Sequence, residues 1–274
     1  MNVQELIRTE GFRRGLRPQT IKTYQYIVNK FLRIYRLDPF NVKKKNIEQH
    51  LNRLLESNKS GSTLNVHLQA LKFFYEKVLH RKLTMYIPLT KVGRRLPEFL
   101  TQDEIKILFN SITNVRHKLM ITFLYASGFR VSELVRLKVK DLDLDSNYGW
   151  IRDSKGGKDR MFIIAEQLNY MLRNWIECNQ LTGDDYLFEG NSSHHYSTQS
   201  IRAIIKKAVK ITRLTKKIHP HSLRHSFATH ILENGYSIME VQPLLGHARL
   251  ETTMIYTHLA SPQLTRVKSP YDSI

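Results

Sequence analysis

Apolar residues recur at helical spacing along most of this chain, and this pattern limits the possible folds more than any other feature. Residues three, four and seven apart lie on one face of a helix, so residues 18–36 are predicted to form an amphipathic helix. Its apolar stripe consists of Ile21, Tyr24, Ile27, Val28, Phe31, Leu32 and Tyr35. The same spacing predicts helices over 2–12, 43–57 and 61–79, and four such helices form a small bundle.

From residue 98 onward, the helical pattern is interrupted by a pair of strand-like runs. Thr101 and Glu104 have the spacing of a capping box, which predicts that a helix starts there. The turn at 154–159 contains two glycines and joins a run around Trp150 to a run at 161–164, so it is expected to be a β-hairpin tip. The other segments predicted to be helical are 101–111, 115–127, 130–137, 166–179, 198–211, 222–234, 237–245 and 248–257.

The predicted fold class is therefore mainly α, with two domains. A helical bundle is expected over residues 1–85, and a mixed helical domain with a small antiparallel sheet over residues 98–274. Residues 86–97 contain two prolines and a glycine without a clean period, which is typical of an interdomain linker.

The charge of the chain indicates a polyanionic partner. The 274 residues carry 43 Lys and Arg against 24 Asp and Glu, a net charge of +19, which exceeds what solubility requires. Residues 1–90 hold 17 basic and 6 acidic side chains, net +11. Because basic side chains neutralise phosphates, the N-terminal bundle is expected to bind nucleic acid, with Lys22, Lys30, Arg33 and Lys43 to Lys45 on its outer faces.

Cysteine usage and hydropathy favour an interior compartment. Cys178 is the only cysteine, so no internal disulfide can form. The first residues contain no apolar signal-peptide core, and no run of about 18 apolar residues occurs anywhere. A soluble cytoplasmic protein without a membrane partner is expected.

Near the C-terminus, cations, histidines and a tyrosine form a pattern suited to phosphoryl transfer. His221 and Arg224 stand three residues apart, which places both on one helix face within reach of a single phosphate. His247 follows Gly246, which is expected to end a helix and expose the imidazole, and Tyr256 lies nine residues further on. Guanidinium groups bind phosphate, histidine titrates near neutrality, and a tyrosine hydroxyl can act as a nucleophile.

Two further cations lie upstream of this cluster. Arg130 follows Ser127-Gly128 at a predicted helix start, where backbone amides favour an anion. Glu133, three residues on, is placed to orient Arg130 by a charge-assisted hydrogen bond. Lys155 stands on the glycine turn, from which an ammonium can enter a DNA groove, and Lys158 is its rival for that role.

In this order, the residues resemble the tyrosine recombinase (phage integrase) family over most of residues 98–260, and the end of the chain is similar to the Xer branch. The family's Arg, Lys, His-x-x-Arg, His and Tyr correspond to Arg130, Lys155, His221 with Arg224, His247 and Tyr256. One departure is Ser154, which replaces the first glycine of the family's Gly-Lys-Gly-x-Lys-x-Arg turn.

The resemblance implies a site-specific DNA recombinase, Xer-like or a small integrase, that cuts and rejoins strands through a 3′-phosphotyrosyl intermediate. In this mechanism Tyr256 attacks the phosphorus and His221 takes its proton. The two arginines and His247 stabilise charge on the phosphate oxygens, and Lys155 protonates the departing 5′-oxygen. No metal or other cofactor is required. The implied partners are double-stranded DNA with specific recombination sites and further copies of the chain, as a tetramer on synapsed DNA.

Several alternatives stay open at this point. A type IB topoisomerase-like relaxation of DNA uses the same chemistry without synapsis, and a DNA-binding protein without catalysis is disfavoured because all six positions hold competent residues. A zinc site at His221 and His225, with His219 and His230 nearby, is disfavoured because no carboxylate or cysteine is interleaved. His225 and His230 are expected to be packed or hydrogen-bonded in the core, as are Tyr125 and Tyr148.

Overall fold

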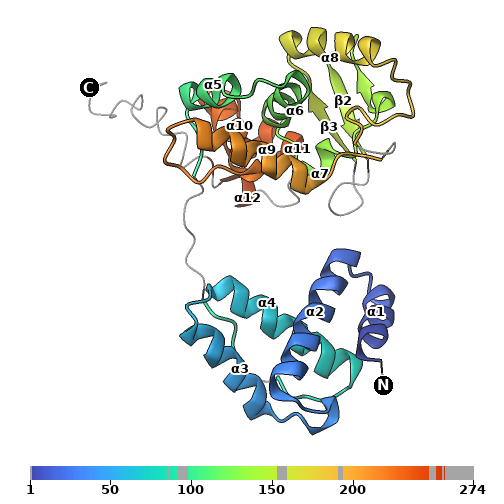
Figure 1. Cartoon of the computed structure of the whole chain (residues 1–274), viewed down its shortest axis with the longest axis vertical. Helices are drawn as coiled ribbons and strands as arrows, with labels where there is room; N and C mark the ends of the chain where they lie inside the picture. The colour runs from blue at the N-terminus through green and yellow to red at the C-terminus, as the bar shows by residue number, and fades with distance from the viewer. Residues whose placement is uncertain are drawn as a thin grey trace, which may run out of the picture. The chain divides into compact units, whose positions relative to one another are not determined.

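The computed structural model describes residues 2–84, 87–91, 98–152, 159–190, 194–246, 251–254 and 256. The chain divides into two compact units, Met1–Arg95 and Leu96–Ile274 (Figure 1). Among the residues described, no helix combines the length and the apolar character that crossing a bilayer requires.

The first unit is a helical bundle, as the apolar periodicity predicts. Its elements are α1 (Val3–Arg13), α2 (Pro18–Tyr35), a 3₁₀ turn η1 (Pro39–Asn41), α3 (Lys44–Glu56), α4 (Gly61–Lys72) and a π-helical segment η2 (Phe73–Val78). The stripe on α2 is confirmed, since Ile27, Val28 and Phe31 are buried. The single α-helix expected over 61–79 is wrong in its last turns, where the backbone widens into η2 and buries three consecutive aromatic residues, 73 to 75.

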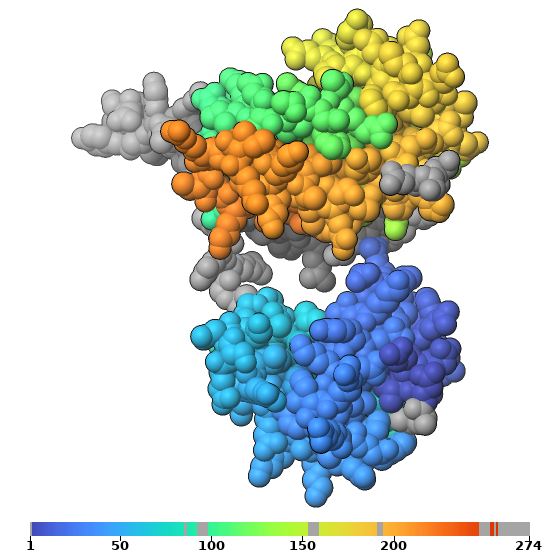
Figure 2. All heavy atoms as spheres, viewed as in Figure 1, coloured from blue at the N-terminus to red at the C-terminus, as the bar shows by residue number. Residues whose placement is uncertain are grey.

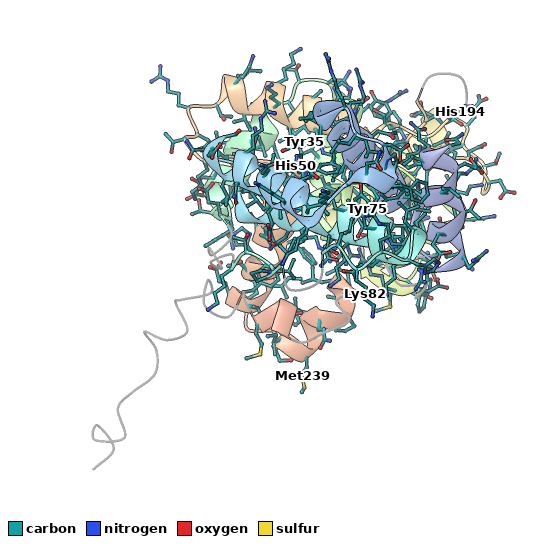
Figure 3. All side chains as sticks on the ribbon, turned by 90° about the horizontal axis from the view of Figure 1, so that it is seen from below. Tyr35, His50, Tyr75, Lys82, His194 and Met239 are labelled. Carbon is teal, nitrogen blue, oxygen red and sulfur yellow. The ribbon has the colours of Figure 1, made fainter. Side chains whose placement is uncertain are left out.

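Two histidines lie inside this bundle and contact each other. The Nε2 atom of His50 on α3 lies 3.0 Å from Nδ1 of His67 on α4. Tyr35 packs edge-on against the His50 ring at 6.0 Å between centroids, and the two labels lie side by side in Figure 3. Burial and the nearby charges of His67, Lys30 and Arg53 lower the pKa of His50 to about 4.

The second unit is mainly helical with one small sheet. Its helices are α5 (Gln102–Asn110), α6 (Val115–Ala126), α7 (Val131–Leu134), the 3₁₀ turn η3 (Val139–Asp141), α8 (Glu166–Cys178), α9 (Thr198–Ile211), α10 (Pro220–Glu233), α11 (Ile238–Leu245) and α12 (Glu251–Met254). The capping box at the start of α5 is confirmed, because the Thr101 side chain accepts from the Glu104 amide and the Glu104 side chain accepts from the Thr101 amide.

The sheet has the order β1-β2-β3, all antiparallel, from β1 (Leu142–Asp143), β2 (Tyr148–Ile151) and β3 (Arg160–Ile163). The predicted hairpin is confirmed, because Ile151 pairs with Arg160 and Tyr148 with Ile163. Strand β1 was not predicted, since two residues are too few to show an alternation. Tyr148 was expected in the core but is only half-buried, because it alternates outward from the buried Ile151.

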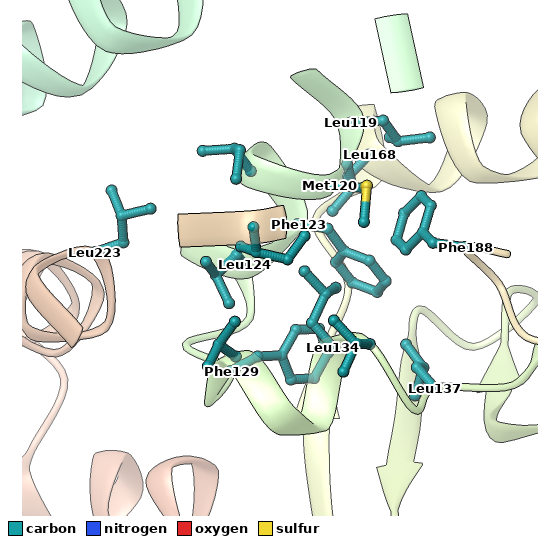
Figure 4. Close-up of a cluster of buried hydrophobic side chains, with 14 of the residues drawn as sticks. Leu119, Met120, Phe123, Leu124, Phe129, Leu134, Leu137, Leu168, Phe188 and Leu223 are labelled. Atoms are coloured by element: carbon teal, nitrogen blue, oxygen red, sulfur yellow. The ribbon is translucent and has the colours of Figure 1, made fainter. Parts of the chain in front are cut away.

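A cluster of aromatic rings anchors the sheet to the helices. Phe129 packs against Phe123 of α6 at 4.9 Å between ring centroids (Figure 4). It also packs against Phe162 of β3 at 4.6 Å, and both contacts are nearly edge to face. All three rings are fully buried. Since Phe129 immediately precedes Arg130, this packing fixes the position at which the arginine leaves the core.

Candidate active site

Arg130 is positioned by a sharp turn between α6 and α7. Gly128 has φ +58°, and a Cβ atom there would lie 2.3 Å from the Phe227 ring of α10. Only glycine fits both the left-handed backbone and the close approach. The turn makes Arg130 the N-cap of α7, as predicted, with the Arg130 amide donating to Glu133 Oε2 at 2.8 Å.

Arg224 on α10 reaches the same turn from the opposite side. Its Nη1 donates to the Gly128 carbonyl at 2.6 Å, and its Nη2 donates to the Leu245 carbonyl at the end of α11. The residue as a whole is 3% exposed. Burial and the nearby Arg130 and Arg160 lower the pKa of Arg224 to about 9, so the guanidinium remains cationic at neutral pH.

Glu133 connects three arginines. Its Oε1 accepts from Arg130 Nη1 at 2.6 Å, its Oε2 accepts from Arg160 Nη2 at 2.6 Å, and Arg224 Nη1 lies 3.9 Å from Oε2. Burial raises the pKa of Glu133, but Arg160 and Arg130 outweigh it and hold the pKa at about 2. Glu133 therefore stays ionised and holds the guanidinium groups in one region.

Arg160 was not among the residues predicted for the site. It is buried on β3, its Nη1 donates to the Leu244 carbonyl, and its guanidinium lies 5.8 Å from the centre of the Phe129 ring. Gly246 leaves room for it, because a Cβ atom there would lie 2.6 Å from Arg160 Cδ. The available signal was the last arginine of the Gly-Lys-Gly-x-Lys-x-Arg pattern, which Arg160 matches.

Tyr256 lies against α10 in this part of the structure. The side chain is 3% exposed and packs in a small apolar cluster with Phe227, Val241 and Leu245. Burial raises the pKa of the Tyr256 hydroxyl, and the positive charges of Arg224 and Arg130 oppose that rise. The hydroxyl lies 2.8 Å from Nδ1 of His225, the residue after Arg224.

His221 and His225, both on α10, differ in their exposure and in their contact with Tyr256. His221 has an exposed side chain, and its ring centroid lies 6.5 Å from that of His225. Partial enclosure by the protein and the charges of His219, Arg224 and Arg130 lower the pKa of His221. The ring in hydrogen-bond contact with the Tyr256 hydroxyl is that of His225, which was expected to be packed or hydrogen-bonded in the core and not to take part in catalysis.

The remaining predicted site residues, Lys155 and His247, lie outside the described residues, as does Lys158. Gly246 ends α11 in the left-handed conformation, as predicted, and its carbonyl accepts from Arg130 Nη2 at 3.3 Å. The residue before His247 therefore contacts the arginine of α7.

Histidines of α10 do not form a metal site among the described residues. His230 Nδ1 contacts the Tyr125 hydroxyl at 2.8 Å, just as His225 contacts Tyr256. Within the described part of the chain, no three His, Cys, Asp or Glu side chains are grouped to hold a metal ion. Both histidines are hydrogen-bonded to tyrosines, as a role in the core predicts.

Comparison with known proteins gives a match over nearly the whole chain. Residues 98–262 match the Phage integrase family, and residues 3–85 match the Phage integrase, N-terminal SAM-like domain. The chain is 34% identical to the tyrosine recombinase XerA of Pyrococcus horikoshii over 253 residues, which cover 91% of this chain and 86% of that protein. It is 31% identical to the tyrosine recombinase XerD of Halalkalibacterium halodurans over 291 residues, covering 98% and 96%.

A solved structure shares the fold. It is the XerH site-specific recombinase bound to palindromic difH substrate in a post-cleavage complex, with a TM-score of 0.74 and 22% identity. The similarity covers 99% of this chain and 85% of that chain.

Proposed function

Because the chain belongs to the phage integrase family and is a site-specific tyrosine recombinase, we propose that Tyr256 is the nucleophile of its DNA strand cleavage. The observation that carries this proposal is the convergence of Arg130, Arg224 and Tyr256. The first and the last of these residues are 126 positions apart along the chain. The charges of both arginines act on the tyrosine hydroxyl. Cations placed beside a nucleophile are suited to a phosphodiester, whose charge grows on the equatorial oxygens during attack.

Arg130 and Arg224 bind the scissile phosphate in this proposal. Glu133 supports the assignment, because one carboxylate aligns Arg130 and Arg160 by hydrogen bonds of 2.6 Å each. Arg130 is the more accessible of the pair, with 19% of its side chain exposed against 4% for Arg224. Preorganised cations stabilise the transition state without reorganising during the reaction.

Lys155, His221 and His247 complete the proposed chemistry. Lys155 protonates the departing 5′-oxygen, His247 donates to a non-bridging phosphate oxygen, and His221, exposed one turn before Arg224, lies near the same phosphate. The product is a 3′-phosphotyrosyl bond. A 5′-hydroxyl from another strand reverses the step, so strand exchange requires no nucleotide.

Double-stranded DNA with specific sites is the proposed substrate, which the difH-bound structure of XerH supports. In the first unit, a surface groove of 760 Å³ on α1 and α2 is suited to the DNA backbone. It is lined by Gln4, Lys22, Gln25, Tyr26, Asn29, Lys30, Arg33 and Ile34. Lys22, Lys30 and Arg33 are exposed as predicted, and Figure 2 shows α2, in mid-blue, at the surface of this unit. Amide and cationic side chains provide donors for phosphates.

A tetramer on two synapsed sites, in the cytoplasm, completes the proposal. The position of the two sites decides whether such an enzyme resolves chromosome dimers, integrates viral or plasmid DNA, or moves a transposon. Relaxation of DNA in the manner of a type IB topoisomerase is not favoured, because the relatives are recombinases.

The test is trapping of a covalent adduct on a nicked suicide duplex. The duplex is the one that the protein selects from a random pool through repeated rounds of binding. Wild type is expected to form an adduct that survives denaturing electrophoresis, whereas Tyr256→Phe binds the duplex within a few-fold and forms none. Arg130→Ala and Arg224→Ala are expected to slow adduct formation by roughly 10²- to 10³-fold. An adduct that persists in Tyr256→Phe assigns the nucleophile to another residue.

A further inference from the structure

A histidine outside the family's six positions lies within hydrogen-bond distance of the proposed nucleophile. His225 Nδ1 lies 2.8 Å from the Tyr256 hydroxyl, within the distance at which a general base takes a proton. The rings are 5.5 Å apart between centroids, and both side chains are anchored, His225 on α10 and Tyr256 in the apolar cluster.

The surroundings of His225 favour its neutral imidazole form. Burial and the charges of His221, His219 and Arg224 lower the pKa of His225 to about 4, so the imidazole is neutral at physiological pH. The positive charges of Arg224 and Arg130 act on the Tyr256 hydroxyl. Guanidinium groups donate hydrogen bonds and cannot accept them. Their field attracts the oxygen lone pairs, so the hydroxyl proton points toward His225 when Nε2 carries the imidazole proton.

We propose that His225 is a further catalytic residue of the cleavage reaction, the base that takes the hydroxyl proton of Tyr256 through Nδ1. This inference rests on the proposed function. As the Tyr256 oxygen forms its bond to phosphorus, the O–H bond breaks and an Nδ1–H bond forms. The bond from phosphorus to the 5′-oxygen breaks, and the leaving oxygen takes a proton from Lys155. In religation the attacking 5′-hydroxyl gives its proton to Lys155 as its oxygen bonds to phosphorus, and the tyrosine oxygen leaves and takes its proton back from His225.

This assignment gives His221 and His225 of α10 different tasks. His221, exposed and 6.5 Å from the His225 ring, is left to contact the phosphate. His225 performs the proton transfer at the side of the tyrosine that faces α10.

The variant that isolates proton transfer is His225→Asn. An asparagine side chain places an oxygen near the position of Nδ1, so it preserves a hydrogen-bond acceptor for Tyr256 but takes up no proton. The matched control is His230→Asn on the same helix, because His230 Nδ1 also lies 2.8 Å from a tyrosine hydroxyl, that of Tyr125. Circular dichroism and duplex binding establish that each variant folds.

Two substrates distinguish the proposed base, His225, from the proposed acid, Lys155. One is the selected suicide duplex, and the other carries a 5′-bridging sulfur at the scissile phosphate, which leaves as a thiolate without protonation. His225→Asn is expected to slow adduct formation by roughly 10²- to 10⁴-fold on both substrates. Lys155→Ala is expected to be slow on the oxygen substrate and near wild type on the sulfur substrate. His230→Asn is expected to stay within a few-fold of wild type on both.

Three outcomes overturn the inference. If a folded His225→Asn variant forms the adduct at the wild-type rate, His225 takes no proton. If the variant forms the adduct faster than wild type, the hydrogen bond from His225 only restrains the tyrosine before cleavage. A defect that disappears on the sulfur substrate assigns His225 to the leaving group. Failure of the proposed function is distinguishable, because then wild type forms no Tyr256-dependent adduct on either substrate.

Discussion

Glu133 on α7 and Arg160 on β3 form an ion pair of 2.6 Å in which both side chains are less than a tenth exposed. The pair joins the first turn of the proposed active site to the sheet, and the same carboxylate holds Arg130. The orientation of the arginines proposed to bind phosphate therefore depends on a residue that itself carries the same sign of charge as DNA.

Glu133→Gln is expected to destabilise the second unit. The change leaves buried cations uncompensated, and breaking a buried pair by removing one partner typically costs about 3–5 kcal/mol. Unfolding in denaturant, followed by the fluorescence of Trp150 and Trp175, measures the loss. The control is Asp103→Asn, whose pair with Lys106 has side chains 86% and 72% exposed, and it should change stability by no more than about 0.5 kcal/mol. Equal effects of the two changes would contradict a supporting role for Glu133.

Gly128→Ala is expected to displace Arg130. The left-handed backbone costs a non-glycine residue roughly 1–2 kcal/mol, and the added Cβ meets the Phe227 ring at 2.3 Å. The control is Gly235→Ala, because Gly235 also has a positive φ, +96°, but a Cβ there meets no atom within 4 Å. Gly128→Ala is expected to melt well below Gly235→Ala, because only the former adds the contact with Phe227. If the two variants melt together, the close approach of Phe227 is not what requires glycine.

The first unit is expected to lose stability in mild acid because of His50. Its pKa is about 4 in the folded protein against an ordinary value of 6.5, so the unfolded chain binds more protons between these values. The contribution, about 3 kcal/mol, is fully present above pH 6.5 and is lost as the pH falls to about 4. Hydrogen exchange of α2 and α3 amides in the full chain, measured across this range, reports the loss.

His50→Gln should flatten that pH dependence, since glutamine retains a donor toward His67 Nδ1 and does not titrate in this range. The control is His80→Asn, which replaces an exposed histidine of the same unit with a residue that tolerates its φ of +52°. A pH dependence that survives His50→Gln would assign acid sensitivity to another group.

Neutralising the groove on α2 is expected to weaken DNA binding. With Lys22, Lys30 and Arg33 all changed to Gln, the slope of log affinity against log salt should fall by about 0.9 for each phosphate contact removed. The charge-retaining control changes both lysines to Arg and Arg33 to Lys, and it should keep the slope. Binding to a fluorescent duplex at several salt concentrations provides the measurement. An unchanged slope in the Gln variant would show that these cations are only solvated.

Local patterns predicted most of the elements, because helix periodicity, capping residues and glycine turns act over a few residues. The stripe of α2, the capping box of α5 and the hairpin of β2 and β3 are examples. Elements without a period were missed, such as the two-residue β1. The π-helical end of α4 was missed for another reason, since it depends on burying the aromatic residues at 73–75 within the bundle.

The sequence by itself determined the two helical regions, the position of Arg130 at a helix start and the order of the chemically competent residues. Only the tertiary structure decided which of them touch. The i, i+3 spacing predicted that His221 and Arg224 share a helix face. The histidine that contacts Tyr256 is nevertheless His225, because the apolar cluster with Phe227 holds the tyrosine beside that turn of α10. Arg160 comes to lie beside Glu133 in the same way, since strand pairing and the missing side chain of Gly246 bring it there. Contacts between residues distant in sequence depend on how apolar faces pack, and that information is not contained in any single segment.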